Sequence, residues 1–180
     1  PAAPGQSITF AGTDIARGET VLRQRTRLTS REIGVLAAIG LDPVPVFRRP
    51  RVAILSTGDE IIPPGQPLPT GCVYDSNAAI LASAVEELGG EPVVLGCVRD
   101  DEEQLHEALM RALAHDIVLL SGGTSKGAGD ISYHVVRRLP APGIVAHGIA
   151  LKPGKPICLA VSGTTPVVIL PGFPTSAIFT

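Results

Sequence analysis

From Arg51 onward, short apolar runs alternate with segments of helical periodicity, and this alternation constrains the fold more than any other feature. The runs at 52–55, 92–98, 117–120 and 167–170 are rich in Val, Ile and Leu and are bounded by turn residues, as buried strands are. Strands separated by helical segments of this length are typical of βαβ units. The sequence therefore predicts an α/β fold: a three-layer, doubly wound, mostly parallel sheet covered on both faces.

Three helical segments carry apolar residues at the spacing of an amphipathic helix. The first follows Ser76, which is a candidate N-cap, and ends at Gly89. The second follows the acidic run 100–103, and acidic residues suit the first turn of a helix. The third follows a glycine-rich loop and has Asp130 as its candidate N-cap.

The first 46 residues have a different character. Turn residues and short β-like pieces lead to a capping box at Thr29–Glu32, and the helix that it opens stops at Gly40. Several prolines follow. We predict an N-terminal segment, 1–46, that belongs to a neighbouring lobe, and an α/β domain, 47–180, whose C-terminal end is truncated. The chain stops four residues into an expected helix, so we expect a fragment of a longer protein.

Composition excludes several classes of function. The net charge is −2, and four Phe, two Tyr and no Trp give no basic, aromatic surface for nucleic acid. No apolar run approaches the roughly 20 residues that span a bilayer, so we expect no membrane association. Three cysteines without a C-x-x-C pair argue against a zinc ribbon or a disulfide framework. We expect a cytoplasmic protein with a small-molecule substrate.

Polar segments follow the predicted strands at the points where the strands end. They are Ser56–Glu60, Arg99–Asp101, Ser121–Ser125 and Pro171–Pro174. In a parallel sheet these ends lie at one edge, and ligands bind in the crevice outside it. We therefore expect these four segments to converge on one site.

The glycine-rich loop that begins at Ser121 offers backbone N–H groups and the hydroxyls of Ser121, Thr124 and Ser125. Such a loop favours a phosphate or an oxyanion, although a simple turn has the same composition. Lys152 and Lys155 flank Pro153-Gly154. Two ammonium groups held close together repel each other unless an anion shares the site, and the alternative is a solvated turn.

Acidic residues lie beside these candidate anion sites. Asp59 and Glu60 directly follow a strand, so at least one of them is expected to face the cleft. Asp100 and Asp130 have a simpler explanation as helix caps. Carboxylates next to lysines and glycine amides suggest Mg²⁺ shared with phosphate oxygens.

These motifs, in this order, resemble the molybdopterin molybdenumtransferases, the molybdenum insertases of the MoeA and gephyrin E-domain type. The resemblance runs from about residue 12 to the end. It is carried by Gly12–Ile15, Ser56–Glu60, Tyr74–Asn77, Arg99–Asp101, Ser121–Ser125 with Asp130, Leu151–Pro156 and Leu170–Pro174.

The resemblance implies a MogA-like molybdopterin-binding domain and an enzyme, a molybdopterin molybdotransferase, that is homodimeric at full length. Such enzymes insert molybdate into adenylylated molybdopterin in a Mg²⁺-dependent step that releases AMP. It implies catalytic roles for Asp14, Glu60, Asp100, Asp130, Lys152 and Lys155, with Glu60, Asp100 and Asp130 as metal ligands. It implies cofactor binding by Thr57, Gly58, Ser121, Gly122, Gly123, Thr124, Ser125, Pro171 and Gly172.

Two other functions remain open at this point. One is the related molybdopterin adenylyltransferase, which shares the fold and the Gly-Gly loop. The other is a non-catalytic domain that binds molybdopterin within a fusion protein. The missing lobes leave open whether the fragment is active alone. The residues do not distinguish molybdate from tungstate, and Lys126 stands where many family members have a small apolar residue.

Overall fold

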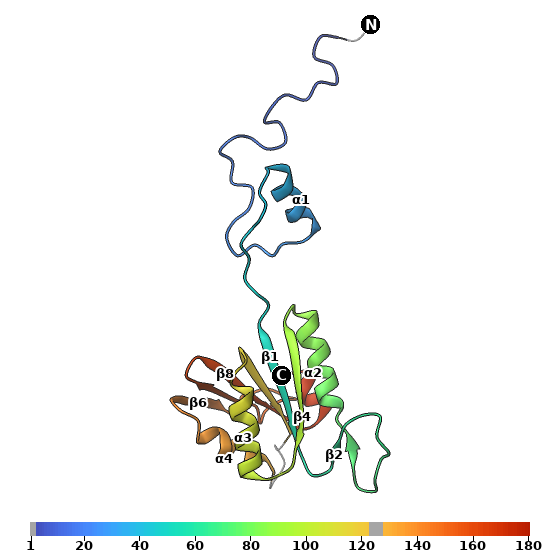
Figure 1. Ribbon diagram of the computed structural model, residues 1–180, viewed down its shortest axis with the longest axis vertical. Coiled ribbons are helices and arrows are strands. Elements are labelled where there is room, and N and C mark those ends of the chain that lie inside the picture. The colour runs from blue at the N-terminus through green and yellow to red at the C-terminus, as the bar shows by residue number, and fades with distance from the viewer. Residues whose placement is uncertain (1–2, 123–127) are drawn as a thin grey trace. The chain divides into compact units, whose positions relative to one another are not determined.

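The computed structural model describes residues 3–122 and 128–180, and for 128–130 it describes the backbone alone (Figure 1). The chain divides into two compact units, Pro1–Phe47 and Arg48–Thr180. Each unit is described separately below. No helix in the described part of the chain is long and apolar enough to cross a membrane.

The first unit contains one helix, α1 (Ser30–Ala38). The expected capping box is confirmed: Thr29 caps the helix, and its backbone N–H donates to Glu32 Oε2 at 2.8 Å. Hydrogen bonds from Thr29 lower the pKa of Glu32. The expected β-like pieces were wrong, because residues 3–28 form turns and irregular backbone. Among the described residues of this unit no strand is present, so the apolar pieces before α1 have no neighbouring strand with which to form a sheet.

The second unit is built on a six-stranded sheet with the order β4-β1-β5-β8-β7-β6. The first four strands in this order are mutually parallel, whereas β7 runs antiparallel to both of its neighbours. A separate two-stranded ladder joins β2 (Ile61–Ile62) to β3 (Val73–Tyr74). The strands of the large sheet are β1 (Arg51–Thr57), β4 (Glu91–Val98), β5 (Ile117–Ser121), β6 (Pro142–His147), β7 (Cys158–Ser162) and β8 (Thr165–Leu170).

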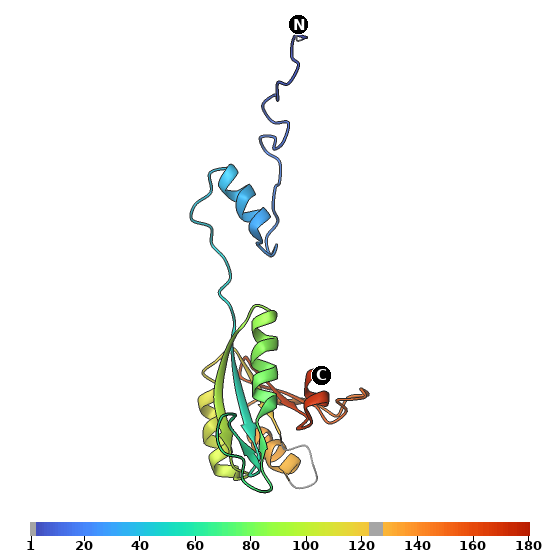
Figure 2. The same ribbon diagram turned by 90° about the vertical axis from the view of Figure 1, so that its right-hand side faces the viewer.

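Helices cover both faces of this sheet, and Figure 2 shows α2 and α3 on opposite sides of it. One layer contains α2 (Ser76–Glu87) and α5 (Pro174–Ile178), and the other contains α3 (Glu102–Ala112) and α4 (Ala128–Arg137). Strand β1 supplies both cores, because its side chains alternate: Val52 and Ile54 pack with α2, whereas Ala53 and Leu55 pack with α3. The predicted three-layer α/β fold is confirmed.

Two predicted helix starts were wrong. Asp75, not Ser76, caps α2, since its carboxylate accepts a hydrogen bond from the N–H of Ala78 at 3.0 Å. The cap position needs non-helical backbone, and Ser76 already has helical backbone. Similarly, α4 begins at Ala128, so Asp130 lies within its first turn and does not cap it.

The register of the strands aligns their ends. Ser56 of β1 lies opposite Ser121 of β5, and Ser121 lies opposite Leu170 of β8. The first residue of β7, Cys158, lies opposite the last residue of β6, His147. The ends of β1, β5, β8 and β6 and the start of β7 therefore lie along one edge of the sheet, which we call the carboxyl edge.

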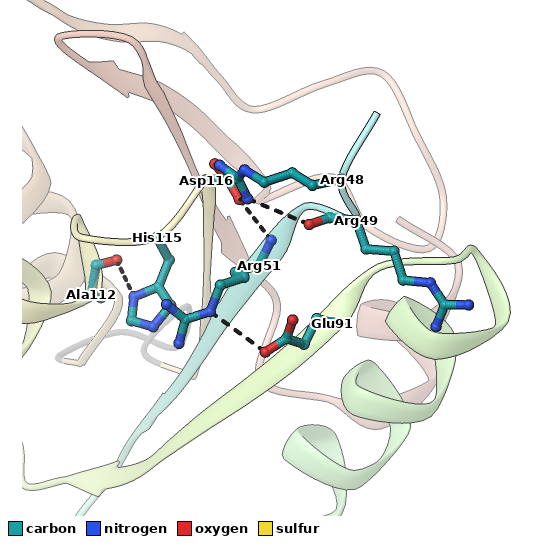
Figure 3. A network of polar contacts seen from close by, with 7 residues as sticks. All are labelled: Arg48, Arg49, Arg51, Glu91, Ala112, His115 and Asp116. Atoms are coloured by element: carbon teal, nitrogen blue, oxygen red, sulfur yellow. Dashed lines mark hydrogen bonds and ion pairs between the residues drawn. The ribbon is translucent and has the colours of Figure 1, made fainter. Parts of the chain in front are cut away.

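A network of polar contacts lies at the opposite edge of the sheet, where β1, β4 and β5 begin (Figure 3). The guanidinium of Arg48 binds both carboxylate oxygens of Asp116, and the N–H of Arg51 donates to Asp116 Oδ2 at 2.7 Å. Arg51 also pairs with Glu91 at 3.5 Å. The hydrogen bonds from Arg48 and Arg51 lower the pKa of Asp116 from 3.8 to about 2.

Candidate active site

The first part of the site joins the ends of β1 and β4. Thr57 is buried, and its hydroxyl donates a hydrogen bond to Asp100 Oδ1 at 3.0 Å. The N–H of Gly58 donates to the carbonyl of Val98 at 3.1 Å. The N–H of Asp100 lies 3.4 Å from Asp59 Oδ1 and donates to it. These bonds hold Asp59 and Asp100 beside each other at the carboxyl edge.

From its position in the sequence, Asp100 was a candidate cap for the following helix. In the structure it does not cap that helix. Asp101 caps α3 instead, by accepting a hydrogen bond from the N–H of Gln104 at 2.8 Å. The neighbouring aspartates thus have separate tasks. Asp101 stabilises the helix start, whereas Asp100 is directed to Thr57 across the strand ends.

Glu60 belongs to the same acidic group. A Cβ atom on Gly58 would lie 3.0 Å from Glu60 Oε2, so this carboxylate folds back over the end of β1. The thiol of Cys97, in β4, has a pKa raised to about 11. The largest cause is burial, and the negative charges of nearby carboxylates add to it: those of Asp75, Asp100, Glu60 and Asp59. The four carboxylates therefore create a negative field at this end of the site.

The second part of the site follows β5. Ser121 and Gly122 are buried, and Gly122 has φ +108°. A Cβ atom there would lie 2.2 Å from the carbonyl oxygen of Thr57, so only glycine fits. The predicted residues Gly123, Thr124 and Ser125 lie outside the described residues, as does Lys126.

The turn after β8 lies against this segment. Pro171 is buried, and a Cβ atom on Gly172 would lie 3.6 Å from the Cα of Gly122. The side-chain amide of Asn77 donates to Ser121 Oγ at 2.7 Å and to the carbonyl of Gly172 at 2.8 Å. The structure thus brings Thr57, Gly122 and Gly172 together in a row along the carboxyl edge.

The lysine loop, residues 148–157, connects β6 to β7 and so begins and ends at the carboxyl edge. Its backbone closes on itself: the N–H of Ile149 donates to the carbonyl of Lys155 at 2.9 Å. Gly154 is buried, and a Cβ atom there would lie 2.7 Å from Thr180 Cγ2. Lys152 and Lys155 are exposed, and no described residue forms a hydrogen bond or ion pair with either ammonium group.

Two predicted acids are not brought to this group by the described structure. Asp14 lies in the first unit, in an exposed turn before α1. Asp130 lies in the first turn of α4, and its side chain is outside the described part. Among the described residues, no three His, Cys, Asp or Glu side chains are arranged as a set of metal ligands.

The Tyr74–Asn77 motif includes Asn77, for which no role was predicted. A signal was present, because Asn77 shares the buried stripe of α2 with Leu81 and Val85. An amide on an apolar stripe must find hydrogen-bond partners in the core. At the end of β6, the ring of His147 stacks on that of Tyr133, with the ring centroids 4.6 Å apart.

Comparisons with known proteins identify the family of this chain. Residues 53–180 match the family described as a probable molybdopterin binding domain, and residues 1–40 match the MoeA N-terminal region (domain I and II). A molybdopterin molybdenumtransferase of Nostoc sp. is 39% identical over 98% of this chain, which covers 41% of that protein. One from Haemophilus influenzae is 35% identical over 98% of this chain and 44% of its own length. The chain spans less than half the length of these relatives.

Solved structures give the same result. A molybdopterin biosynthesis MoeA protein from Pyrococcus horikosii matches with a TM-score of 0.84 and 40% identity, over 98% of this chain and 44% of that one. A molybdopterin biosynthesis protein from Mycobacterium abscessus, at 18% identity and a TM-score of 0.55, shares the fold over 71% of this chain and 84% of its own. The chain therefore belongs to the family of molybdopterin-binding domains, in the form found in the molybdopterin molybdenumtransferases.

Proposed function

We propose that the protein to which this chain belongs inserts molybdate into adenylylated molybdopterin and releases AMP. The observation that carries the proposal is the convergence of an acidic group and the lysine loop on one edge of the sheet. Such an arrangement suits a substrate with a pyrophosphate and a co-substrate that is a dianion. The family relationship supports the same reaction.

The residues at the acidic end fit Mg²⁺. They offer carboxylate oxygens, which are the ligands that this ion prefers, and their negative field is not balanced by a described cation. We propose that Glu60 and Asp100 hold the ion together with Asp130. When bound, Mg²⁺ would polarise the phosphoanhydride.

The other residues of the chain would bind and orient the substrate. We propose that Lys152, Lys155 and the backbone amides from Gly122 to Gly123 hold the negative charge of molybdate and of the phosphates. The hydroxyls of Thr124 and Ser125 would add donors, and Thr57, Gly58, Pro171 and Gly172 would form the floor. We also propose a catalytic role for Asp14, which lies in the first unit. The expected homodimer and the cytoplasmic location stay predictions.

The test is cofactor formation by the complete protein from adenylylated molybdopterin, molybdate and Mg²⁺, with AMP release measured in parallel. We expect Lys155→Ala and Asp130→Asn to abolish most turnover, while Arg111→Ala, an exposed change on α3, leaves it unchanged. ATP-dependent adenylylation of molybdopterin would instead identify an adenylyltransferase. Tight pterin binding without molybdate-dependent AMP release would identify a non-catalytic binding domain.

A further inference from the structure

Asn77 links the end of β5 to the segment that follows β8, next to the last residue pair between these two strands. The backbone ladder between β5 and β8 ends at the pair Ser121 and Leu170. Gly122 and Gly172 follow this pair and lie outside the strands. The side-chain amide of Asn77 donates one hydrogen bond to Ser121 Oγ, at the end of β5, and a second to the carbonyl of Gly172, two residues beyond the end of β8.

The orientation of the amide is fixed by its partners. A carbonyl oxygen can only accept, so the atom of Asn77 that faces Gly172 must be the nitrogen. This leaves Oδ1 buried without a hydrogen-bond partner among the described residues.

The backbone that carries Asn77 is itself held firmly. Asp75 caps the helix two residues before Asn77, and Leu81 and Val85 anchor the same stripe of α2 in the core. Asn77 is more than nine-tenths buried. The position of its side-chain amide is therefore well defined, and the amide holds Ser121 and Gly172 in place through its two hydrogen bonds.

We propose that Asn77 is a positioning residue, which sets the Gly122 and Gly172 segments relative to each other so that they present one surface to the substrate. This inference rests on the proposed function of the carboxyl edge. Gly122 is then confined from both sides, by the carbonyl of Thr57 and by the Gly172 segment that Asn77 holds. Asn77 acts through these neighbours and has no assigned contact with substrate.

The test uses the complete protein and two substitutions of different character. Asn77→Asp keeps the shape but replaces both donors with a carboxylate. Asn77→Leu removes the polar group and suits the apolar stripe, so this variant is expected to fold even if the carboxylate does not. Ser83→Asp, on the exposed face of the same helix, is the control for added charge.

The readouts are kcat and KM per folded molecule, with the folded fraction taken from circular dichroism. We expect kcat/KM to fall about 10- to 100-fold in both Asn77 variants, mainly through kcat, because displaced binding groups no longer match the transition state. Ser83→Asp should stay within about twofold of wild type. Unchanged kcat and KM per folded molecule in Asn77→Leu would overturn the inference and leave the proposed function standing. Inactive wild-type protein would instead refute the proposed function.

Discussion

The hydroxyl of Thr57 donates a hydrogen bond to the carboxylate of Asp100 across 43 residues of sequence, at 3.0 Å. The bond links the ends of two neighbouring parallel strands, β1 and β4, directly beside the other acids of the site. It assigns the neighbouring carboxylates, Asp100 and Asp101, to different tasks, and these tasks can be separated by substitution.

Asp100→Asn should lower kcat/KM strongly and leave the stability of the fold nearly unchanged, because Asp100 makes no helix cap and an amide oxygen can still accept the hydrogen bond of Thr57. Asp101→Ala should do the reverse. It removes the cap of α3, which costs about 1 kcal/mol of unfolding free energy, and leaves kcat near wild type. Urea unfolding and steady-state kinetics on both variants check this, and equal loss of activity in the two would contradict the assignment.

Gly122→Ala should destabilise the second unit severely. The Cβ atom would meet the carbonyl of Thr57, and the backbone at φ +108° disfavours any side chain. Strain of about 1–2 kcal/mol and overpacking of about 1–3 kcal/mol are expected together. The matched control is Gly65→Ala, where φ is +90° but no atom lies within 4 Å. Thermal melts of the two should differ, and equal melting temperatures would argue against the close approach.

Asp116→Asn tests the network of Figure 3 through pH. The pKa of Asp116 is depressed in the folded protein, from 3.8 to about 2, so its ionised form stabilises the fold above pH 3.8. This contribution is lost as the pH falls from about 4 towards 2. The melting temperature of the variant should therefore lie below that of wild type at pH 7, and the gap should narrow below pH 4.

Cys97 can report cation binding at the acidic end. Burial and four carboxylates raise its pKa to about 11, so iodoacetamide should alkylate it slowly at pH 8. Mg²⁺ held by Glu60 and Asp100 would offset part of the negative field, lower this pKa and speed alkylation. Cys158, whose pKa is raised by burial alone, is the internal control. Mass spectrometry of both sites, with and without Mg²⁺, should show a change at Cys97 only; no change there would argue against a metal at this position.

The sequence predicted the sheet and its functional edge because both follow from local patterns. Apolar runs bounded by turn residues marked the four parallel strands β1, β4, β5 and β8 of the large sheet, and the polar residues that follow parallel strands had to meet. The direction of β7 was beyond such reasoning, since strand direction depends on pairing. Because β7 runs antiparallel, the residues before it, including Lys155, join the edge at which the parallel strands end.

Local sequence patterns also could not predict which of two adjacent aspartates caps a helix. Asp100 and Asp101 have the same side chain at a helix start, and only the backbone conformation decides which one caps. Likewise, the partners of Asn77 lie 44 and 95 residues away, so no window of sequence contains them. Asp130 and Gly123–Ser125 remain predictions, because their side chains lie outside the described residues.

A crystal structure of the complete protein with adenylylated molybdopterin and Mg²⁺ would test the central claim most directly. The account predicts phosphates at the carboxyl edge, with Glu60 and Asp100 on one side and the ammonium group of Lys155 within hydrogen-bond distance on the other. A ligand bound elsewhere, or bound at this edge with Glu60, Asp100 and Lys155 all directed away from it, would contradict the account.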